Sequence, residues 1–210
     1  MNTFETFDAI YCINLSDRKD RWKDSKIEFE KVGISNIVER ISGIRHIDGR
    51  VGIIKSVRKC LIKAKKENLK NVLIFEDDIK FINNPIINLN NSLEELRICE
   101  FEWDLFYLGA NTHQKLEKCG NSLIRLKNAF AAHSIVYNSS IFDRVINFAD
   151  TVNEIKEFNQ IYDVWLSEIQ KEGKTYMVNP IITTQRASYS DIERKMVDYS
   201  FIEERFKQNS

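Results

Sequence analysis

Three consecutive acidic residues, Glu76, Asp77 and Asp78, follow the apolar run "NVLIF" at positions 71–75. Neighbouring carboxylates repel one another and are costly to bury, so we expect a positive partner beside them. Hard carboxylate oxygens suit Mg²⁺ or Mn²⁺, and such an ion also binds phosphate groups. The triplet therefore predicts a metal site formed by Glu76, Asp77 and Asp78. The simpler alternative is a solvated acidic turn after a strand.

A second polar group follows the first apolar segment, "FDAIYCINL" at positions 7–15. Asn14 lies at the end of this segment, and Arg18 and Arg21 lie on the first turns of the helix expected next. The planar guanidinium of arginine suits a diphosphate or a nucleobase carbonyl, and a helix N-terminus adds backbone donors. Taken with a nearby metal site, Asn14, Arg18 and Arg21 indicate a site for a nucleoside diphosphate. Surface charges on a capped helix are the alternative.

Strand and helix patterns alternate along the chain and predict an α/β fold with a largely parallel sheet, because consecutive βα units form such sheets. Ligands bind such sheets beyond the carboxyl ends of the strands, where the triplet lies. No linker or repeat interrupts the pattern, so residues 1–210 are predicted to form one domain. We expect strands over 7–15, 36–42, 71–76, 103–109, 122–128, 133–138 and 175–184, and helices over 16–33, 51–69, 91–98, 139–150, 161–173 and 190–208.

The composition narrows the class of protein. The 210 residues include 31 basic and 31 acidic side chains, so no overall charge favours nucleic acid or an anionic membrane. No apolar run approaches the roughly 18 residues that a membrane span requires. The N-terminus lacks a secretory signal pattern, and the four cysteines show no paired spacing, so a cytoplasmic protein with reduced thiols is expected.

A metal-dependent nuclease is a competing interpretation of the triplet. Asp78-Ile79-Lys80 gives the acid-x-Lys pattern of such enzymes at the end of a strand. These enzymes also need a further acid on a paired strand and usually a basic face. Neither feature is evident in the sequence.

The segments "IYCINLSDRKDRW", "VLIFEDDIKF" and "WDLFYLGAN" together resemble glycosyltransferase family 25, the lipopolysaccharide-type and collagen-type galactosyltransferases. "YDVWL" resembles the D-x-x-L helix of this family, and "NPIITTQRASYSDI" resembles its terminal segment. The resemblance spans roughly residues 8–192 with the motifs in the family's order. One motif departs from the pattern: where the family often has G-C-x-x-S-H, this chain has "GIIKSV" at 52–57, which keeps Gly52 and Ser56 but has Ile53 and Val57.

The resemblance implies a GT-A fold with a Rossmann-like, mostly parallel central sheet flanked by helices. It also implies inverting transfer of a sugar, a hexose such as galactose or glucose, from a UDP-sugar with Mn²⁺ or Mg²⁺. The acceptor would be a glycan, a lipid-linked or a protein group. Because of the departure at Ile53 and Val57, a related protein that binds a nucleotide or glycan without catalysis is the alternative.

Further site residues follow from the resemblance and from position in the fold. Asp163, in "YDVWL", is the expected general base, because inverting transfer needs a carboxylate to take the proton of the acceptor hydroxyl. Asp104 is the second candidate, although it lies at the wrong end of a strand. Expected donor-binding residues beyond the N-terminal group are Ser56 in the helix motif, Asn111 past Gly109, and Gln185, Ser188 and Ser190 in the terminal segment.

Overall fold

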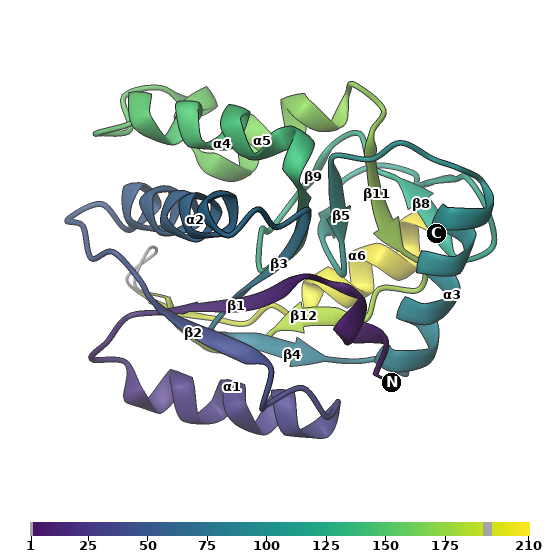
Figure 1. The fold of residues 1–210 in the computed structure, drawn as a ribbon, viewed down its shortest axis with the longest axis horizontal. Coiled ribbons are helices and arrows are strands. Elements are labelled where there is room, and N and C mark those ends of the chain that lie inside the picture. The colour runs from purple at the N-terminus through teal and green to yellow at the C-terminus, as the bar shows by residue number, and fades with distance from the viewer. Residues whose placement is uncertain (1, 191–194) are drawn as a thin grey trace.

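A mixed eight-stranded sheet forms the centre of the computed structural model, which describes residues 2–190 and 195–210 (Figure 1). The strands lie in the order β2-β1-β3-β10-β5-β11-β8-β7. Their bounds are β1 Ala9–Asn14, β2 Val38–Ser42, β3 Asn71–Glu76, β5 Leu105–Tyr107, β7 Glu117–Lys118, β8 Leu123–Arg125, β10 Ser134–Asn138 and β11 Thr175–Val178.

Most strands of this sheet point in one direction. β1 pairs in parallel with β2 and with β3, and β11 pairs in parallel with β5. β10 lies antiparallel between β3 and β5, and β8 lies antiparallel between β11 and β7. The predicted α/β class with a mostly parallel central sheet is therefore confirmed, with β10 and β8 as the reversed strands.

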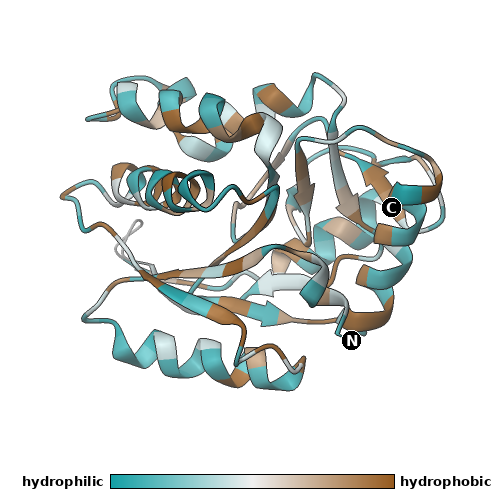
Figure 2. Cartoon of the chain, viewed as in Figure 1, coloured by the Kyte–Doolittle hydropathy of each residue, from teal (hydrophilic) through white to brown (hydrophobic). Residues whose placement is uncertain are grey.

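Helices cover both faces of the sheet (Figure 1). They are α1 Lys19–Lys31, α2 Gly49–Lys66, α3 Pro85–Ile98, α4 Ser139–Thr151, α5 Tyr162–Gln170 and α6 Phe201–Asn209, with short 3-10 helices at Thr3–Thr6 and Phe158–Gln160. One apolar core lies between the sheet and α2, α4, α5 and α6, and a second lies between the sheet and α1 and α3. The outward side of α1 is mainly hydrophilic, whereas β5 is mainly hydrophobic (Figure 2). Val57 is buried in the first core, as its place on the apolar stripe of the helix predicts.

Within the described residues, three two-stranded ladders lie outside the central sheet. β4 Ile79–Phe81 pairs with β12 Thr183–Gln185, and β6 Asn111–Thr112 pairs with β9 Ala129–Phe130. The segment that leads into β12 crosses the end of β5 so closely that a Cβ atom at Gly109 would lie 2.1 Å from the carbonyl oxygen of Thr183. Gly109 therefore does more than end a strand, since it leaves the space through which the terminal segment reaches the acidic triplet.

The C-terminal tail differs from the expected helix over 190–208. The third ladder pairs β13 Ser188–Ser190 with β14 Lys195–Val197, and helix α6 begins only at Phe201. Backbone pairing in this ladder satisfies groups that a helix would otherwise pair internally. Residues 191–194, part of the expected helix, lie outside the described residues.

The remaining sequence expectations concern the cysteines and the membrane. Cys12 and Cys60 are buried, as their apolar segments predict, and all four cysteines are free thiols. Among the described residues, no helix is both long and apolar enough to cross a membrane.

Candidate functional site

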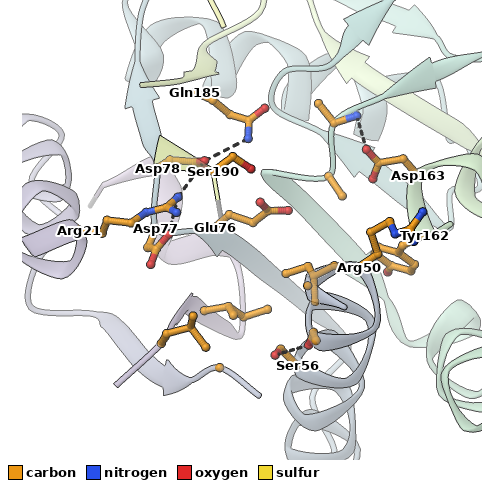
Figure 3. Close-up of a pocket in the computed structure, with 18 of the residues that line it drawn as sticks. Arg21, Arg50, Ser56, Glu76, Asp77, Asp78, Tyr162, Asp163, Gln185 and Ser190 are labelled. Atoms are coloured by element: carbon orange, nitrogen blue, oxygen red, sulfur yellow. Dashed lines mark hydrogen bonds and ion pairs between the residues drawn. The ribbon is translucent and has the colours of Figure 1, made fainter. Parts of the chain in front are cut away.

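A cavity of about 990 Å³ opens beyond the carboxyl ends of β1 and β3 (Figure 3). The reversed strand β10 begins at this same edge, so the residues just before it also line the cavity. The acidic triplet lies on one side and the first turn of α5 on the other. The lining includes Leu15, Arg21, Gly43, Ile44, Arg45, His46, Arg50, Ile53, Ser56, Glu76, Asp77, Asp78, Asn111, Phe130, Ala131, Ala132, Tyr162, Asp163, Gln185, Tyr189 and Ser190.

Arg21 supplies the positive charge that the acidic triplet requires. Its Nη2 atom lies 2.7 Å from Asp77 Oδ1 and 2.9 Å from Asp78 Oδ2, and all three side chains are almost completely buried. Burial lowers the pKa of Arg21, but the two carboxylates outweigh it and raise the pKa above its ordinary value. The side chain predicted to contact a donor is thus occupied in holding two of the three acids.

Two further side chains fix the backbone and orientation of the triplet. Asn14 donates its amide to Asp77 Oδ2 at 2.5 Å, and the guanidinium of Arg186 donates to the carbonyl oxygens of Asp77 and Ile79 at 2.6 and 2.5 Å. Burial raises the pKa of Asp77 to about 6, although Arg21 and Asn14 both favour its charged form. Asn14 therefore acts on the site through Asp77, and it is not among the residues that line the cavity.

Arg21→Ala should lower the stability of the fold. The substitution leaves Asp77 and Asp78 buried beside each other without their cation, and breaking a buried pair in this way costs about 3–5 kcal/mol. For a chain of this size the melting temperature should fall by roughly 6–20 °C. Calorimetric melting of the two proteins measures this difference.

Arg18→Ala is the matched control for the Arg21 variant. Arg18 lies on the same helix end and pairs with Asp20, whose side chain is 65% exposed, so its pair contributes at most about 1 kcal/mol. Equal melting temperatures for the Arg21→Ala variant and the parent would show that the buried pair does not stabilise the triplet.

Asp78 keeps one carboxylate oxygen for a ligand. Its Oδ2 atom contacts Arg21 and accepts a hydrogen bond from Gln185 at 3.2 Å, whereas Oδ1 is buried and has no hydrogen-bond partner within the described residues. An unpaired buried carboxylate oxygen is costly, and this one belongs to a residue that lines the cavity. The donor set at Asp78 therefore fits a cation or a hydrogen-bond donor brought by a ligand.

Glu76 points into the cavity between the aspartates and Asp163 (Figure 3). Burial, with the charges of Asp78 and Asp163 adding to it, raises the pKa of Glu76 well above its ordinary value. Within residues 2–190 and 195–210, no group of three or more His, Cys, Asp or Glu side chains is arranged to hold a metal ion. An ion at Asp78 would thus need ligands from a substrate or water, which is the usual manner of Mg²⁺.

Asp163 lies across the cavity from the triplet, in the first turn of α5 (Figure 3). Its Oδ2 atom accepts a hydrogen bond from the backbone N–H of Ala131 at 2.9 Å. Burial raises the pKa of Asp163, while the N–H groups of Ala131 and Ala132 oppose this shift. Such a carboxylate, half-buried and facing the cavity, has the properties of a general base. Asp104 lies at the start of β5, where it bonds Ser140 at the opposite end of the sheet.

The structure brings together Ser56, Asn111 and Gln185 of the predicted donor-binding set, all of which line the cavity. The Ser56 hydroxyl donates to Gly52 O at 2.7 Å and accepts from Ile44 N at 2.8 Å, so it holds the loop after β2 onto α2. Arg18 and Ser188 are not among the lining residues, and Ser190 contributes to the cavity from the segment of Ser188.

The loop before α2 and the first turn of α2 form a part of the site that was not predicted from the sequence. Arg45, His46 and Arg50 of "GIRHIDGR" line the cavity, with Arg45 paired to Asp17 and Arg50 paired to Asp48. The signal in the sequence was three basic side chains within six residues at the start of a helix, two before Gly49 and one after it. Phe130, Ala131 and Ala132 carried no such signal, because small and aromatic residues occur in any core.

Comparison with solved structures shows a fold shared with one glycosyltransferase. A glycosyltransferase involved in glycosylating the major capsid of PBCV-1 is 10% identical over 95% of this chain and 98% of its own, with a TM-score of 0.53. A protein of STIV is 9% identical over 90% and 92% of the two chains, with a TM-score of 0.49. An apo UDP-glucose pyrophosphorylase is 8% identical over 81% and 72%, with a TM-score of 0.45. No family model and no curated protein matches the sequence.

Proposed function

We propose that this protein is an inverting, metal-dependent glycosyltransferase that transfers a hexose from a UDP-sugar to a glycan, lipid-linked or protein acceptor. The observation that carries the proposal is that Asp78 and Asp163 both line one cavity, on opposite sides of it. Asp78 offers a free carboxylate oxygen for a cation, and Asp163 offers a basic carboxylate opposite it. The sequence resemblance to glycosyltransferase family 25 and the fold shared with the PBCV-1 enzyme support the same class.

The donor is proposed to lie over the carboxyl ends of β1 and β3. Asp78, with Glu76 beside it, would hold Mn²⁺ or Mg²⁺, which supplies charge compensation for a diphosphate. Asp77 would act by fixing Arg21 and the turn, since both its oxygens already have partners. Gln185 bonds Asp78 at this end, and Gln185 and Asn111, which both line the cavity, would provide hydrogen-bonding groups for the sugar.

The proposed chemistry places Asp163 at the acceptor. Its carboxylate takes the proton of the acceptor hydroxyl as that oxygen bonds to the anomeric carbon of the donor sugar. The bond from the anomeric carbon to the β-phosphate oxygen breaks, and UDP leaves with the bonding electrons. The elevated pKa of Asp163 makes it a stronger base than an exposed aspartate.

A nucleotide-binding protein without catalysis is the second candidate. Arg21 already pairs with both Asp77 and Asp78, and within the described residues no three acidic, histidine or cysteine side chains are arranged as a metal site. Such a protein would bind a nucleotide sugar without needing a metal and without turning it over.

Release of UDP from a panel of UDP-sugars, with Mn²⁺ and simple glycosides or water as acceptors, distinguishes the two candidates. We expect release above the protein-free rate for at least one donor, and its loss in Asp163→Asn. Binding of a UDP-sugar with no release by any donor, and identical behaviour of Asp163→Asn, would favour the non-catalytic protein.

A further inference from the structure

Gln170 is buried completely at the far end of α5, and its amide is fully used. Its Oε1 atom accepts from the backbone N–H of Ala129 at 2.8 Å, and its Nε2 atom donates to the carbonyl oxygen of Ala129 at 2.9 Å. Nε2 also lies 3.2 Å from the hydroxyl oxygen of Tyr107. One side chain therefore satisfies both backbone groups of Ala129, as a neighbouring β-strand would.

Gln170 and Asp163 face the same backbone segment. They are seven residues apart on one helix, which is close to two full turns, so their side chains leave the same face of α5. Gln170 holds Ala129, and Asp163 accepts from the N–H of Ala131 two residues later. Helix α5 therefore holds segment 129–131 through two side chains, Gln170 at Ala129 and Asp163 at Ala131.

The segment between these two points is strained. Ala131 has φ of 72°, a left-handed conformation that costs a non-glycine residue free energy unless its surroundings impose it. The N–H of this same residue donates to the carboxylate of Asp163. The same segment pairs with β6, where Phe130 lies opposite Asn111, another residue of the cavity.

We propose that Gln170 is a positioning residue, which locks the backbone of Ala129 so that the N–H of Ala131 stays directed at the carboxylate of Asp163. This inference goes beyond the role of Asp163 as base and rests on the proposed function only for its effect on turnover. The dependence of the hydrogen bond between Ala131 and Asp163 on Gln170 does not require any particular substrate or reaction.

Gln170→Met removes both hydrogen bonds to Ala129 and keeps an unbranched side chain of similar length. Once the N–H of Ala131 can turn away, the charged form of Asp163 loses a donor, so its pKa should rise by roughly one unit. The other ionisable groups facing Asp163 are Glu76 on β3, Tyr107 on β5 and Tyr162 on its own helix. Carbon-13 NMR of labelled aspartate carboxyls, assigned with Asp163→Asn, measures this shift without any substrate.

Ser167→Ala is the control on the same helix. Its hydroxyl bonds only the carbonyl of Val164, so it should leave the pKa of Asp163 at the parent value. When kcat is measured as a function of pH, its acid limb should shift to higher pH for Gln170→Met and not for Ser167→Ala. The KM for the donor should not change. An Asp163 pKa equal to that of the parent in folded Gln170→Met would overturn the proposal.

Amide hydrogen exchange of the parent decides the matter if Gln170→Met does not fold. The N–H groups of Ala129 and Ala131 should exchange as slowly as the interior of α5, because these two contacts open only when the helix does. Fast exchange of Ala131 beside a protected α5 would show that segment 129–131 moves independently and would overturn the proposal. Absence of any sugar transfer would refute the proposed function and leave both physical measurements to stand.

Discussion

Asp163→Asn lowers sugar-nucleotide turnover by about 10²–10⁴-fold, the usual loss when a general base is removed, and leaves UDP affinity close to that of the parent. The asparagine keeps the size of the side chain and an oxygen for the N–H of Ala131, but it cannot take a proton from the acceptor. Steady-state rates of UDP release, with UDP affinity by titration calorimetry, measure the two effects separately.

Asp104→Asn is the matched control for this prediction. Asp104 was the second candidate base, but it bonds Ser140 at the other end of the sheet, so its loss should not change turnover. A large loss of UDP affinity in Asp163→Asn would contradict the role of Asp163 as base, because it would place the carboxylate at the donor.

We expect Asp78→Asn to abolish metal-dependent UDP binding and, with it, turnover. The reason is the Oδ1 atom, which is buried without a partner in the described part of the chain. An amide supplies no anionic oxygen there, so a cation between Asp78 and a diphosphate loses its protein ligand. Titration of UDP into each variant in the presence of Mn²⁺ gives the result directly.

Asp77→Asn separates the two adjacent aspartates. Both oxygens of Asp77 have protein partners, Arg21 and Asn14, so this change should lower stability while UDP binding still responds to Mn²⁺. Intact Mn²⁺-dependent binding in Asp78→Asn would mean that the triplet is an acidic turn held by Arg21.

The position of the site could be predicted from the sequence because apolar runs end there in polar residues. "NVLIF" before the triplet and "IYCI" before Asn14 mark two parallel neighbours, and parallel strands place their carboxyl ends at one edge. The burial of Val57 in the core could be predicted for the same reason, because it follows from the spacing of apolar residues within one helix.

What could not be predicted depends on contacts between distant segments. The run "SIVYN" predicts a strand but carries no information on its direction, and β10 runs antiparallel between two parallel strands. Only that reversal brings Ala131 and Ala132 to the site edge. The expected helix over 190–208 also begins later in the structure, at Phe201. The residues of β14, which precede it in the chain, pair with β13 instead of joining the helix.

The positive partner of the acidic triplet could not be predicted either. Repulsion among three acids requires a positive charge, but sequence spacing does not tell a metal ion from an arginine on another element. Arg21 reaches Asp77 and Asp78 from α1, across more than fifty positions of the chain. The role of Gln170 could not be predicted for a related reason. A glutamine on an apolar helix face shows no sequence pattern that indicates which backbone groups it bonds.

Titration calorimetry of UDP with the unmodified protein, in Mn²⁺ and again in excess chelator, shows whether the cavity binds a nucleoside diphosphate through a cation held at Asp78. We predict saturable binding with Mn²⁺ and no detectable binding in chelator, because the bare acidic side chains repel the phosphates. Equal UDP affinity in both conditions, or no binding in either, would contradict the account.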